Sequence, residues 1–486
     1  MRMMSPSIGT LHFVGIGGIG MSGIATLLVS LGYSVQGSDI AENANTKCLR
    51  EKGVRVYIGH DADHIKNEDG SLPVVVVVSS AIKDDNPELM AARAAKIPVA
   101  QRAEMLAELM RLKTSVAVAG THGKTTTTSM VGQMLDQAGF DPTVVNGGIV
   151  NAYGTNMRFG ESQWMVVEAD ESDGSFTGLP ATVGVVTNID PEHMDHYGSF
   201  DEVKKAYRQF ISGLPFHGYA LLCIDHPEVQ TLAAQVQDRK IITYGFNPQA
   251  DVRAENIVSN GDGSTFDVIF AGWLNHDGQE VVMTGVHLSM LGRHNVQNSL
   301  VSLGIAKEMG ISLEDMRMAL DDFGGVKRRF TKTGAVDGIT VIDDYAHHPV
   351  EIGVVLKTAR SAVEQVGGQV IAVMQPHRYT RLQSLYEDFC RCFNDADHVI
   401  IADVYEASEQ PIEGVNKDYL VEGLRNYGHR SAQALPERQD LARMVNEIAQ
   451  SGDYVIVMGA GSSTHWAYDL PEELKIERAK ITGAVA

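Results

Sequence analysis

The chain contains 486 residues, 44% of them hydrophobic, and its acidic residues outnumber its basic residues by 61 to 40. A chain of this length is too long for one ordinary core and predicts about three domains. The formal net charge of −21 opposes non-specific binding to nucleic acid or to anionic membranes, so any anionic substrate must be met by local cations.

Cysteine usage and hydropathy indicate the compartment. The four cysteines, Cys48, Cys223, Cys390 and Cys392, show no C-x-x-C spacing, which favours a reducing compartment over disulfides or a cysteine metal site. The first residues lack the apolar core of a signal peptide, and no apolar run reaches the ~18 residues of a membrane helix. We therefore expect a cytoplasmic protein with no membrane insertion and no nucleic-acid partner.

The first predicted strand, residues 11–14, runs into a glycine-rich turn and a helix that extends through Leu31. Glycines at this spacing let the backbone approach a pyrophosphate, and Asp39, after the next strand, can accept from ribose hydroxyls. Two hypotheses follow: an NAD(P)-dependent oxidoreductase, or a site for a nucleotide-linked substrate. The valine-rich strand at 73–78 ends in Ser79 and Ser80, at the edge where doubly wound sheets bind ligands.

A second unit begins near Thr114, where a buried strand leads into Gly120-Thr121-His122-Gly123-Lys124-Thr125-Thr126 and then a helix through Leu135. This arrangement directs several backbone N–H groups and the positive end of a helix dipole at one point, which suits phosphates. Lys124 adds a cation, and Thr125 a hydroxyl suited to Mg²⁺. The loop is shorter than the usual G-x-x-x-x-G-K-[ST] pattern because its first glycine is Gly120.

Two further strands of this unit, residues 164–167 and 183–187, deliver acids to the same sheet edge. A hard cation that bridges ATP phosphates would offset their mutual repulsion. Glu168, next to its strand, is the preferred ligand, and His193 is a candidate for a metal or phosphate contact. A solvated acidic turn is the alternative interpretation of Asp170, Glu171 and Asp173. Alternating residues over 252–288, with a turn at 261–263, predict an antiparallel addition.

A third unit follows the basic segment Lys327-Arg328-Arg329, which marks a domain junction. Strands are predicted at 339–342, 369–374, 398–402 and 454–458, with helices between them, so a third doubly wound sheet is expected. The last strand runs into a glycine-rich segment, residues 459–464, to which the sequence assigns no role.

Bound ATP, an acidic metal site and cations from a separate domain imply phosphoryl transfer or ATP-driven condensation, with hydrolysis for motion as the competing class. The phosphate loop favours a nucleotide-linked substrate at the first glycine turn, because a dehydrogenase has no use for a second triphosphate site. Domain closure around the substrates would exclude water from a reactive phosphate.

Eight ordered blocks of the sequence resemble the Mur ligase family. They are residues 12–24, 119–128, 146–148, 168–173, 188–195, 292–295, 343–349 and 375–381. The resemblance implies an α/β fold of three domains, with Rossmann-like N-terminal and C-terminal domains around a P-loop ATP-binding domain. The expected boundaries are 1–113 for the UDP-substrate domain, 114–328 for the central ATPase domain and 329–486 for the C-terminal ligase domain.

The resemblance also implies an activity, the ATP-dependent ligation of L-alanine to UDP-N-acetylmuramate in cytoplasmic peptidoglycan precursor synthesis, with ATP and Mg²⁺ as cofactors. The sugar's carboxylate would attack the γ-phosphate, and the amine of L-alanine would attack the resulting acyl phosphate. One alternative lies within the family, a ligase that attaches a tripeptide to the same sugar nucleotide during recycling. The other is a P-loop ATPase that serves as a binding or assembly module.

Site residues are implied by the same resemblance, block by block. ATP contacts fall on Gly120, Thr121, His122, Gly123, Lys124, Thr125, Thr126, Asn298, Arg329 and Asp344. Metal contacts fall on Thr125, Glu168 and His193, and catalytic roles on Lys124, Glu168, His193 and Arg329. The UDP part would contact Gly15, Gly17, Gly18, Gly20, Asp39, Ser79 and Ser80. The amino acid or product would contact Tyr345, His347, His377, Arg378 and Arg381, because a guanidinium fork binds a carboxylate bidentately.

Overall fold

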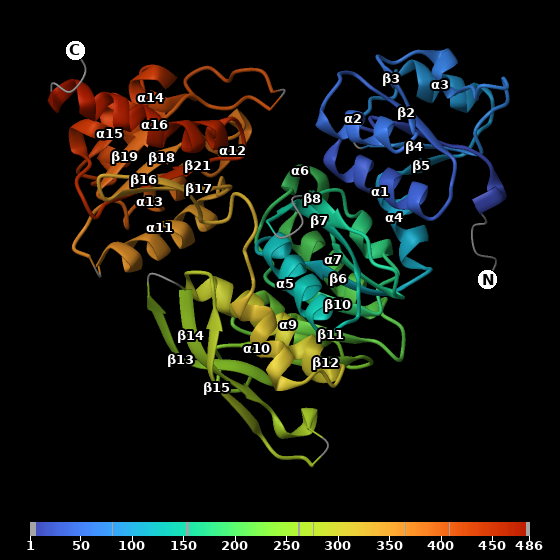
Figure 1. The fold of residues 1–486 in the computed structure, drawn as a ribbon, viewed down its shortest axis with the longest axis horizontal. Helices are drawn as coiled ribbons and strands as arrows, with labels where there is room; N and C mark the ends of the chain where they lie inside the picture. The colour runs from blue at the N-terminus through green and yellow to red at the C-terminus, as the bar shows by residue number, and fades with distance from the viewer. Residues whose placement is uncertain are drawn as a thin grey trace. The chain divides into compact units, whose positions relative to one another are not determined.

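The computed structural model describes residues 6–79, 81–151, 155–260, 263–275, 277–364, 366–407 and 409–482. The strands form three sheets, each accompanied by helices, which confirms the predicted α/β fold (Figure 1). By compactness the chain divides into two units. The first is Met1–Glu255, Val268–Thr284 and Gln297–Phe323, and the second is Asn256–Asp267, Gly285–Val296 and Gly324–Ala486.

The first sheet is parallel throughout and has the strand order β3-β2-β1-β4-β5. Its strands are β1 Leu11–Val14, β2 Val35–Asp39, β3 Arg55–Ile58, β4 Val75–Val78 and β5 Val99–Gln101. Its helices are α1 Ile19–Ser30, α2 Ala44–Glu51, α3 Pro87–Ala94 and α4 Arg102–Met110. The strand order reverses beside β1, so the glycine turn after β1 lies at the switch point where doubly wound sheets bind ligands.

The second sheet places the phosphate-loop strand β6 between β9 and β10, and both neighbours run parallel to it. The strands are β6 Thr114–Ala119, β7 Thr143–Val150, β8 Thr155–Arg158, β9 Trp164–Glu168, β10 Val183–Val186, β11 Tyr219–Cys223, β12 Lys240–Gly245, β13 Val252–Asn260, β14 Gly263–Phe270 and β15 Val281–Leu288. The helices are α5 Lys124–Gln137, α6 Met194–Tyr197, α7 Phe200–Ser212, α8 Pro227–Gln235, α9 Arg293–Glu308 and α10 Leu313–Asp321. The carboxyl ends of β6, β9 and β10 therefore meet at one edge, as predicted.

Helix α9 begins at Arg293, directly after Gly292, which has a left-handed φ of 96°. Strand β13 pairs with β12 in parallel, and residues 261 and 262 of the predicted turn lie outside the described residues.

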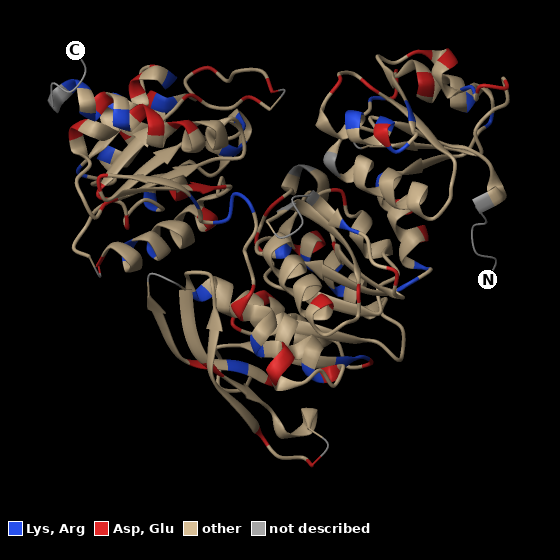
Figure 2. Cartoon of the chain, viewed as in Figure 1, with Lys and Arg blue, Asp and Glu red and all other residues tan. Residues whose placement is uncertain are grey.

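The third sheet has the order β16-β17-β21-β18-β19-β20 and is parallel except for β16, which pairs antiparallel with β17. Its strands are β16 Thr331–Val336, β17 Ile339–Asp344, β18 Val370–Met374, β19 His398–Ile401, β20 Ala432–Ala434 and β21 Tyr454–Met458. Its helices are α11 Pro349–Glu364, α12 Tyr379–Ser384, α13 Tyr386–Arg391, α14 Lys417–Asn426, α15 Leu441–Ile448 and α16 Ser463–Thr482. The segment between α10 and β16 contains Lys327, Arg328 and Arg329, and it is coloured blue for basic residues in Figure 2.

The side chains of alternate residues along these strands pack into two hydrophobic cores, one on each face of the third sheet. Ala372 and Met374 of β18 pack with α11, α13 and α14, whereas Ile371 and Val373 pack with α15 and α16. Such two-sided burial explains why the strands read as continuous apolar runs. Among the described residues, no helix is long and apolar enough to cross a membrane.

Candidate nucleotide and ligation site

The loop between β6 and α5 depends on two glycines. Gly120 has a φ of 132° and Gly123 a φ of 84°, both in the left-handed region that glycine favours. A Cβ at Gly120 would collide with the hydroxyl of Thr187, and a Cβ at Gly123 would lie 2.8 Å from Oδ1 of Asn298. The structure therefore brings Asn298, a predicted ATP contact, against the phosphate loop.

The residues after β10 fix the loop from outside. Asn188 accepts a hydrogen bond from the N–H of His122 at 2.7 Å and donates to its carbonyl at 3.0 Å. Thr187 donates to the same carbonyl at 2.6 Å, and Thr121 accepts from the N–H of Asp190 at 2.8 Å. The sequence prediction gave Asn188 no role, although its place directly after a buried strand beside the loop was a usable signal.

Lys124 points back into its own loop and toward an acid. Its ammonium donates to the carbonyls of Gly120 at 2.7 Å and Thr121 at 3.1 Å and to Oε1 of Glu171 at 2.9 Å. Burial alone would lower the pKa of Lys124, but the attraction of Glu171 and Glu168 outweighs it, so the pKa is raised and the lysine stays charged.

Glu171 is buried, with 4% of its surface exposed. The alternative interpretation of a solvated acidic turn is therefore wrong for this residue, because its carboxylate faces Lys124. It fits Asp173, which is exposed and accepts from Ser175. Asp170, half-buried, lies 3.2 Å from Nη2 of Arg102.

The predicted metal residues fall into two neighbouring groups. Thr125 donates to Oε1 of Glu168 at 3.0 Å, and Oε2 of Glu168 accepts from the N–H of Gly147 at 2.6 Å. His193 instead groups with Glu171 and Glu192, whose ligand atoms all lie within 4.8 Å of one another.

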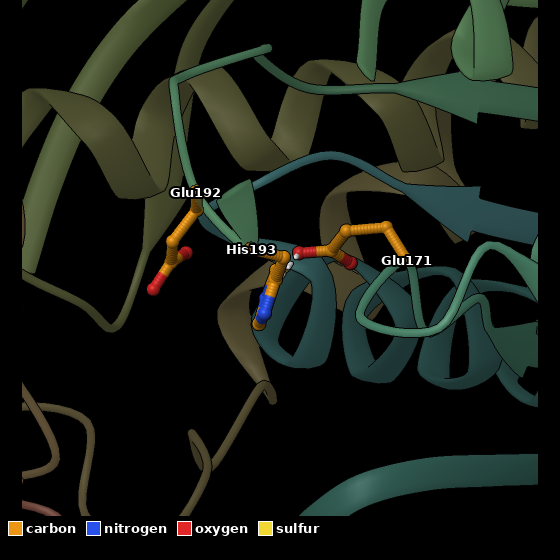
Figure 3. Close-up of side chains that lie close together, drawn as sticks. All are labelled: Glu171, Glu192 and His193. Carbon is orange, nitrogen blue, oxygen red and sulfur yellow. Dashed lines mark ion pairs between the residues drawn. The ribbon is translucent and has the colours of Figure 1, made fainter. Parts of the chain in front are cut away.

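Figure 3 shows the carboxylate of Glu171 pointing toward His193, with Nε2 of His193 3.8 Å from Oε1. Carboxylate and hydroxyl oxygens at this edge fit Mg²⁺, which prefers oxygen ligands. The sequence alone assigns no site role to Glu171 or Glu192, although both stand in the acidic segments that follow β9 and β10.

The glycine turn after β1 is held by the end of β2. Gly15, with a φ of 81°, donates its N–H to the carbonyl of Ser38 at 2.8 Å, and Gly17 donates to Oδ2 of Asp39 at 2.7 Å. Gly18 caps α1 and Gly20 lies in its first turn. Ser79 is adjacent, since its Oγ would lie 3.3 Å from a Cβ at Gly15. Ser80 lies outside the described residues. The turn thus gathers the described members of the predicted UDP site.

In the second unit, Asp344 ends β17 and organises the junction. Its carboxylate accepts from the N–H groups of Phe330 and Ala346, each at 2.7 Å. Burial raises the pKa of Asp344 to about 6, while Arg329 opposes the rise. Arg328 and Arg329 both approach the ring of Tyr345, at 4.5 and 5.6 Å from its centroid. Asp343 and Asp344 belong to the strand itself, whereas the prediction placed them after its end.

The predicted amino-acid residues form a second group in this unit. The ring of His377 stacks on Tyr405 at 5.5 Å and approaches His347 edge-on at 5.7 Å. Nη1 of Arg381 lies 3.4 Å from Nδ1 of His377. Burial, His347 and Arg381 lower the pKa of His377 to about 4, so this imidazole is neutral near pH 7. His377 would therefore bring no positive charge to a carboxylate bound here, whereas Arg378 and Arg381 would.

Arg378 occupies an unusual backbone position beside this group. Its φ is 73°, and its N–H donates to the carbonyl of Tyr405 at 2.9 Å. A non-glycine residue in this region is strained and often marks a functional site. Arg378 lies three residues before Arg381 and is the second candidate cation for the carboxylate of the amino acid.

Three family models match successive parts of the chain. "Mur ligase family, catalytic domain" matches residues 10–114, "Mur ligase middle domain" matches 118–306, and "Mur ligase, glutamate ligase domain" matches 328–461. Together they cover most of the sequence.

Individual proteins are similar over nearly the whole chain. A UDP-N-acetylmuramate–L-alanine ligase of Rhodospirillum centenum is 61% identical over 474 residues, which are 98% of this chain and 96% of the relative. A protein of the same name from Bradyrhizobium sp. (strain ORS 278) is 59% identical over 468 residues, 96% of this chain and 98% of the relative. The crystal structure of UDP-N-acetylmuramate–alanine ligase from Thermotoga maritima aligns with a TM-score of 0.76 and 28% identity, over 98% of this chain and 100% of that chain. The chain belongs to the Mur ligase family.

Proposed function

We propose that this protein joins L-alanine to UDP-N-acetylmuramate at the expense of ATP, and that it does so in the cytoplasm. The observation that carries the proposal is the half-buried Lys124 at the phosphate loop, flanked by Thr125, Glu168 and the Glu171–Glu192–His193 cluster. The proposed substrates are the ones that appear in the names of two relatives. These relatives are 59% and 61% identical to this chain over nearly their whole length.

In the first step, a carboxylate oxygen of the sugar attacks the γ-phosphorus of ATP, and ADP leaves with the electron pair of the broken P–O bond. Backbone N–H groups of residues 120–126 would hold the phosphates, and Lys124 would neutralise charge on the β- and γ-oxygens. Asn298 and Asp344 would contact the adenosine, and Arg329 the γ-phosphate. Thr125, Glu168 and His193 would hold Mg²⁺, which supplies a Lewis acid for the phosphate oxygens.

In the second step, the amine of L-alanine attacks the acyl carbon, an amide bond forms, and phosphate leaves. The amine must be neutral, so one proton is released on the way to the amide. Arg381 would bind the alanine carboxylate with both arms of its guanidinium, while the neutral His377 can contribute only hydrogen bonds. Tyr345, His347 and Arg378 complete this group. The glycine turn and Asp39 would bind the UDP part, with residues 1–113, 114–328 and 329–486 as the three functional domains.

Phosphate release tests the proposal. Release should require ATP, UDP-N-acetylmuramate and L-alanine together, and the product should carry one amide-linked alanine. The same assay with a tripeptide in place of L-alanine tests the recycling alternative. Release that ignores both substrates would favour the binding-module alternative instead.

A further inference from the structure

A buried glutamate in the first α/β domain is surrounded by histidines, and the proposed mechanism does not use it. Glu88 lies in the first turn of α3, with Oε2 at 2.6 Å from Nε2 of His12 on β1. Its Oε1 lies 3.0 Å from Nδ1 of His60, which follows β3, and 3.9 Å from Nδ1 of His64 in the 3-10 helix Ala62–Ile65. The side chains of Glu88 and His12 are fully buried.

The carboxylate of Glu88 is stabilised in its charged form. Burial alone would raise the pKa of Glu88, but hydrogen bonds from His12, Ser38 and His60 outweigh burial and hold the pKa below its usual value. Its position at a helix N-terminus, where Asn86 caps the backbone, also favours negative charge. Glu88 therefore accepts hydrogen bonds as an anion.

The network fixes the orientation of His12. Because Nε2 donates to Glu88, Nδ1 is left to accept, and Nε2 of Gln36 on β2 lies 3.2 Å from it. Gln36 also donates to the carbonyl of Ile65 at 3.1 Å and contacts Arg55 of β3. One carboxylate thus joins side chains from β1, β2 and the segment after β3.

This network reaches the glycine turn through Ser38. Oγ of Ser38 lies 3.0 Å from Nδ1 of His60, while its carbonyl accepts from the N–H groups of Gly15 and Ile16 at 2.8 and 2.9 Å. The next residue, Asp39, accepts from the N–H of Gly17. His12 stands three residues before Gly15 on the same strand. The ends of β1 and β2, which shape the turn, are therefore both linked to Glu88 through hydrogen bonds.

A buried ion pair adds little to the free energy of unfolding, because well-packed apolar residues of similar volume usually stabilise a fold at least as much. Buried polar networks instead specify one geometry when all their members are satisfied. We propose that Glu88 is a positioning residue that sets the glycine turn for the diphosphate of the UDP-linked substrate. This inference rests on the proposed function of that turn.

The test compares two changes on the same helix. Glu88→Gln keeps the shape of the side chain but removes its charge and one acceptor, so UDP-N-acetylmuramate and UDP should each bind about tenfold more weakly. The KM for ATP and kcat at saturating sugar nucleotide should stay within about twofold of the wild type. The control Asn86→Ala removes the helix cap, whose oxygen accepts from the N–H groups of Glu88 and Leu89, and leaves the histidine contacts in place. It should lower the Tm without weakening UDP binding.

Ser38→Ala provides a second variant with little change in volume. It removes the hydroxyl that links His60 to the turn, so UDP affinity should fall in the same direction as in Glu88→Gln. Titration calorimetry with UDP alone, without ATP or alanine, gives the readout. Unchanged UDP binding in Glu88→Gln, or an equal loss in Asn86→Ala, would overturn the proposal. Failure of the wild type to ligate alanine would instead refute the proposed function.

Discussion

The ammonium of Lys124 lies 2.8 Å from Oε2 of Glu171, and the two side chains are only 15% and 5% exposed. An ion pair this far from water holds the lysine within its own loop. When phosphates arrive, the lysine can exchange one anionic partner for another. The acidic segment after β9 therefore keeps Lys124 charged, in addition to the metal-binding role that we propose for it.

Glu171→Gln should lower the Tm of the ligand-free protein, because breaking a buried pair typically costs about 3–5 kcal/mol. The increase in Tm produced by ATP should be larger than in the wild type, since the phosphates then provide the missing negative charge. Thermal unfolding with and without ATP in excess EDTA measures both effects. Asp173→Asn, an exposed acid two residues away, is the matched control and should change neither quantity.

The two groups of residues proposed to bind metal can be separated by the magnesium dependence of their variants. Glu168→Gln should need about tenfold or more Mg²⁺ for half-maximal turnover, because one oxygen ligand persists without its charge. Glu192→Gln tests the cluster around His193 in the same titration. A Glu168→Gln curve that superimposes on the wild type would remove Glu168 from the ligand set.

Arg381→Lys should raise the KM for L-alanine by up to about a hundredfold and leave the KM for ATP little changed. Lysine keeps the charge but loses the fork geometry, and a charge-assisted pair contributes about 1.5–3 kcal/mol. Arg378→Lys is the comparison. If Arg378→Lys alone impairs the use of alanine, the carboxylate contact has been assigned to the wrong arginine.

Asp343 gives the protein a pH-dependent stability. Among the described residues its Oδ2 has no hydrogen-bond partner, and burial raises the pKa of Asp343 to about 6. The folded state thus holds this proton more tightly than the unfolded chain, whose aspartates titrate near about 4. The group therefore lowers the free energy of unfolding as the pH rises from about 4 to about 6, with no further loss above that.

Asp343→Asn removes this titration and keeps an oxygen to accept from Thr464. The stability of the variant relative to the wild type should rise between pH 4 and pH 7 by up to about 3 kcal/mol. Denaturant unfolding at several pH values measures the difference. Asp388→Asn, which changes an exposed acid on α13, is the control variant for the same measurement.

The sequence predicted those features that depend on local pattern. Strands at 11–14 and 454–458 match β1 and β21, because short, mainly apolar runs with glycines close to both ends are typical of buried strands. The two glycine turns were also predictable, since their spacing reflects the close approach of backbone to phosphate. Short edge strands such as β20 were not, because three residues carry no periodic signal.

The sequence could not predict which acids face inward. Asp170, Glu171 and Asp173 are all acidic residues of one short segment, so the sequence does not distinguish them. Only the packing of the loop after β9 turns Glu171 toward Lys124. Likewise, His12 and Glu88 are 76 residues apart, and no local rule pairs them. Long-range contacts of this kind depend on strand order, which the sequence prediction did not resolve.

Phosphate release by the purified protein, measured with each substrate omitted in turn, tests the proposed ligase activity most directly. Phosphate should be released only when ATP, UDP-N-acetylmuramate and L-alanine are all present, in a one-to-one ratio with the amide product. Lys124→Met should reduce that rate by about a hundredfold or more. Equal release in the absence of L-alanine, or near-normal turnover in Lys124→Met, would contradict the proposed activity.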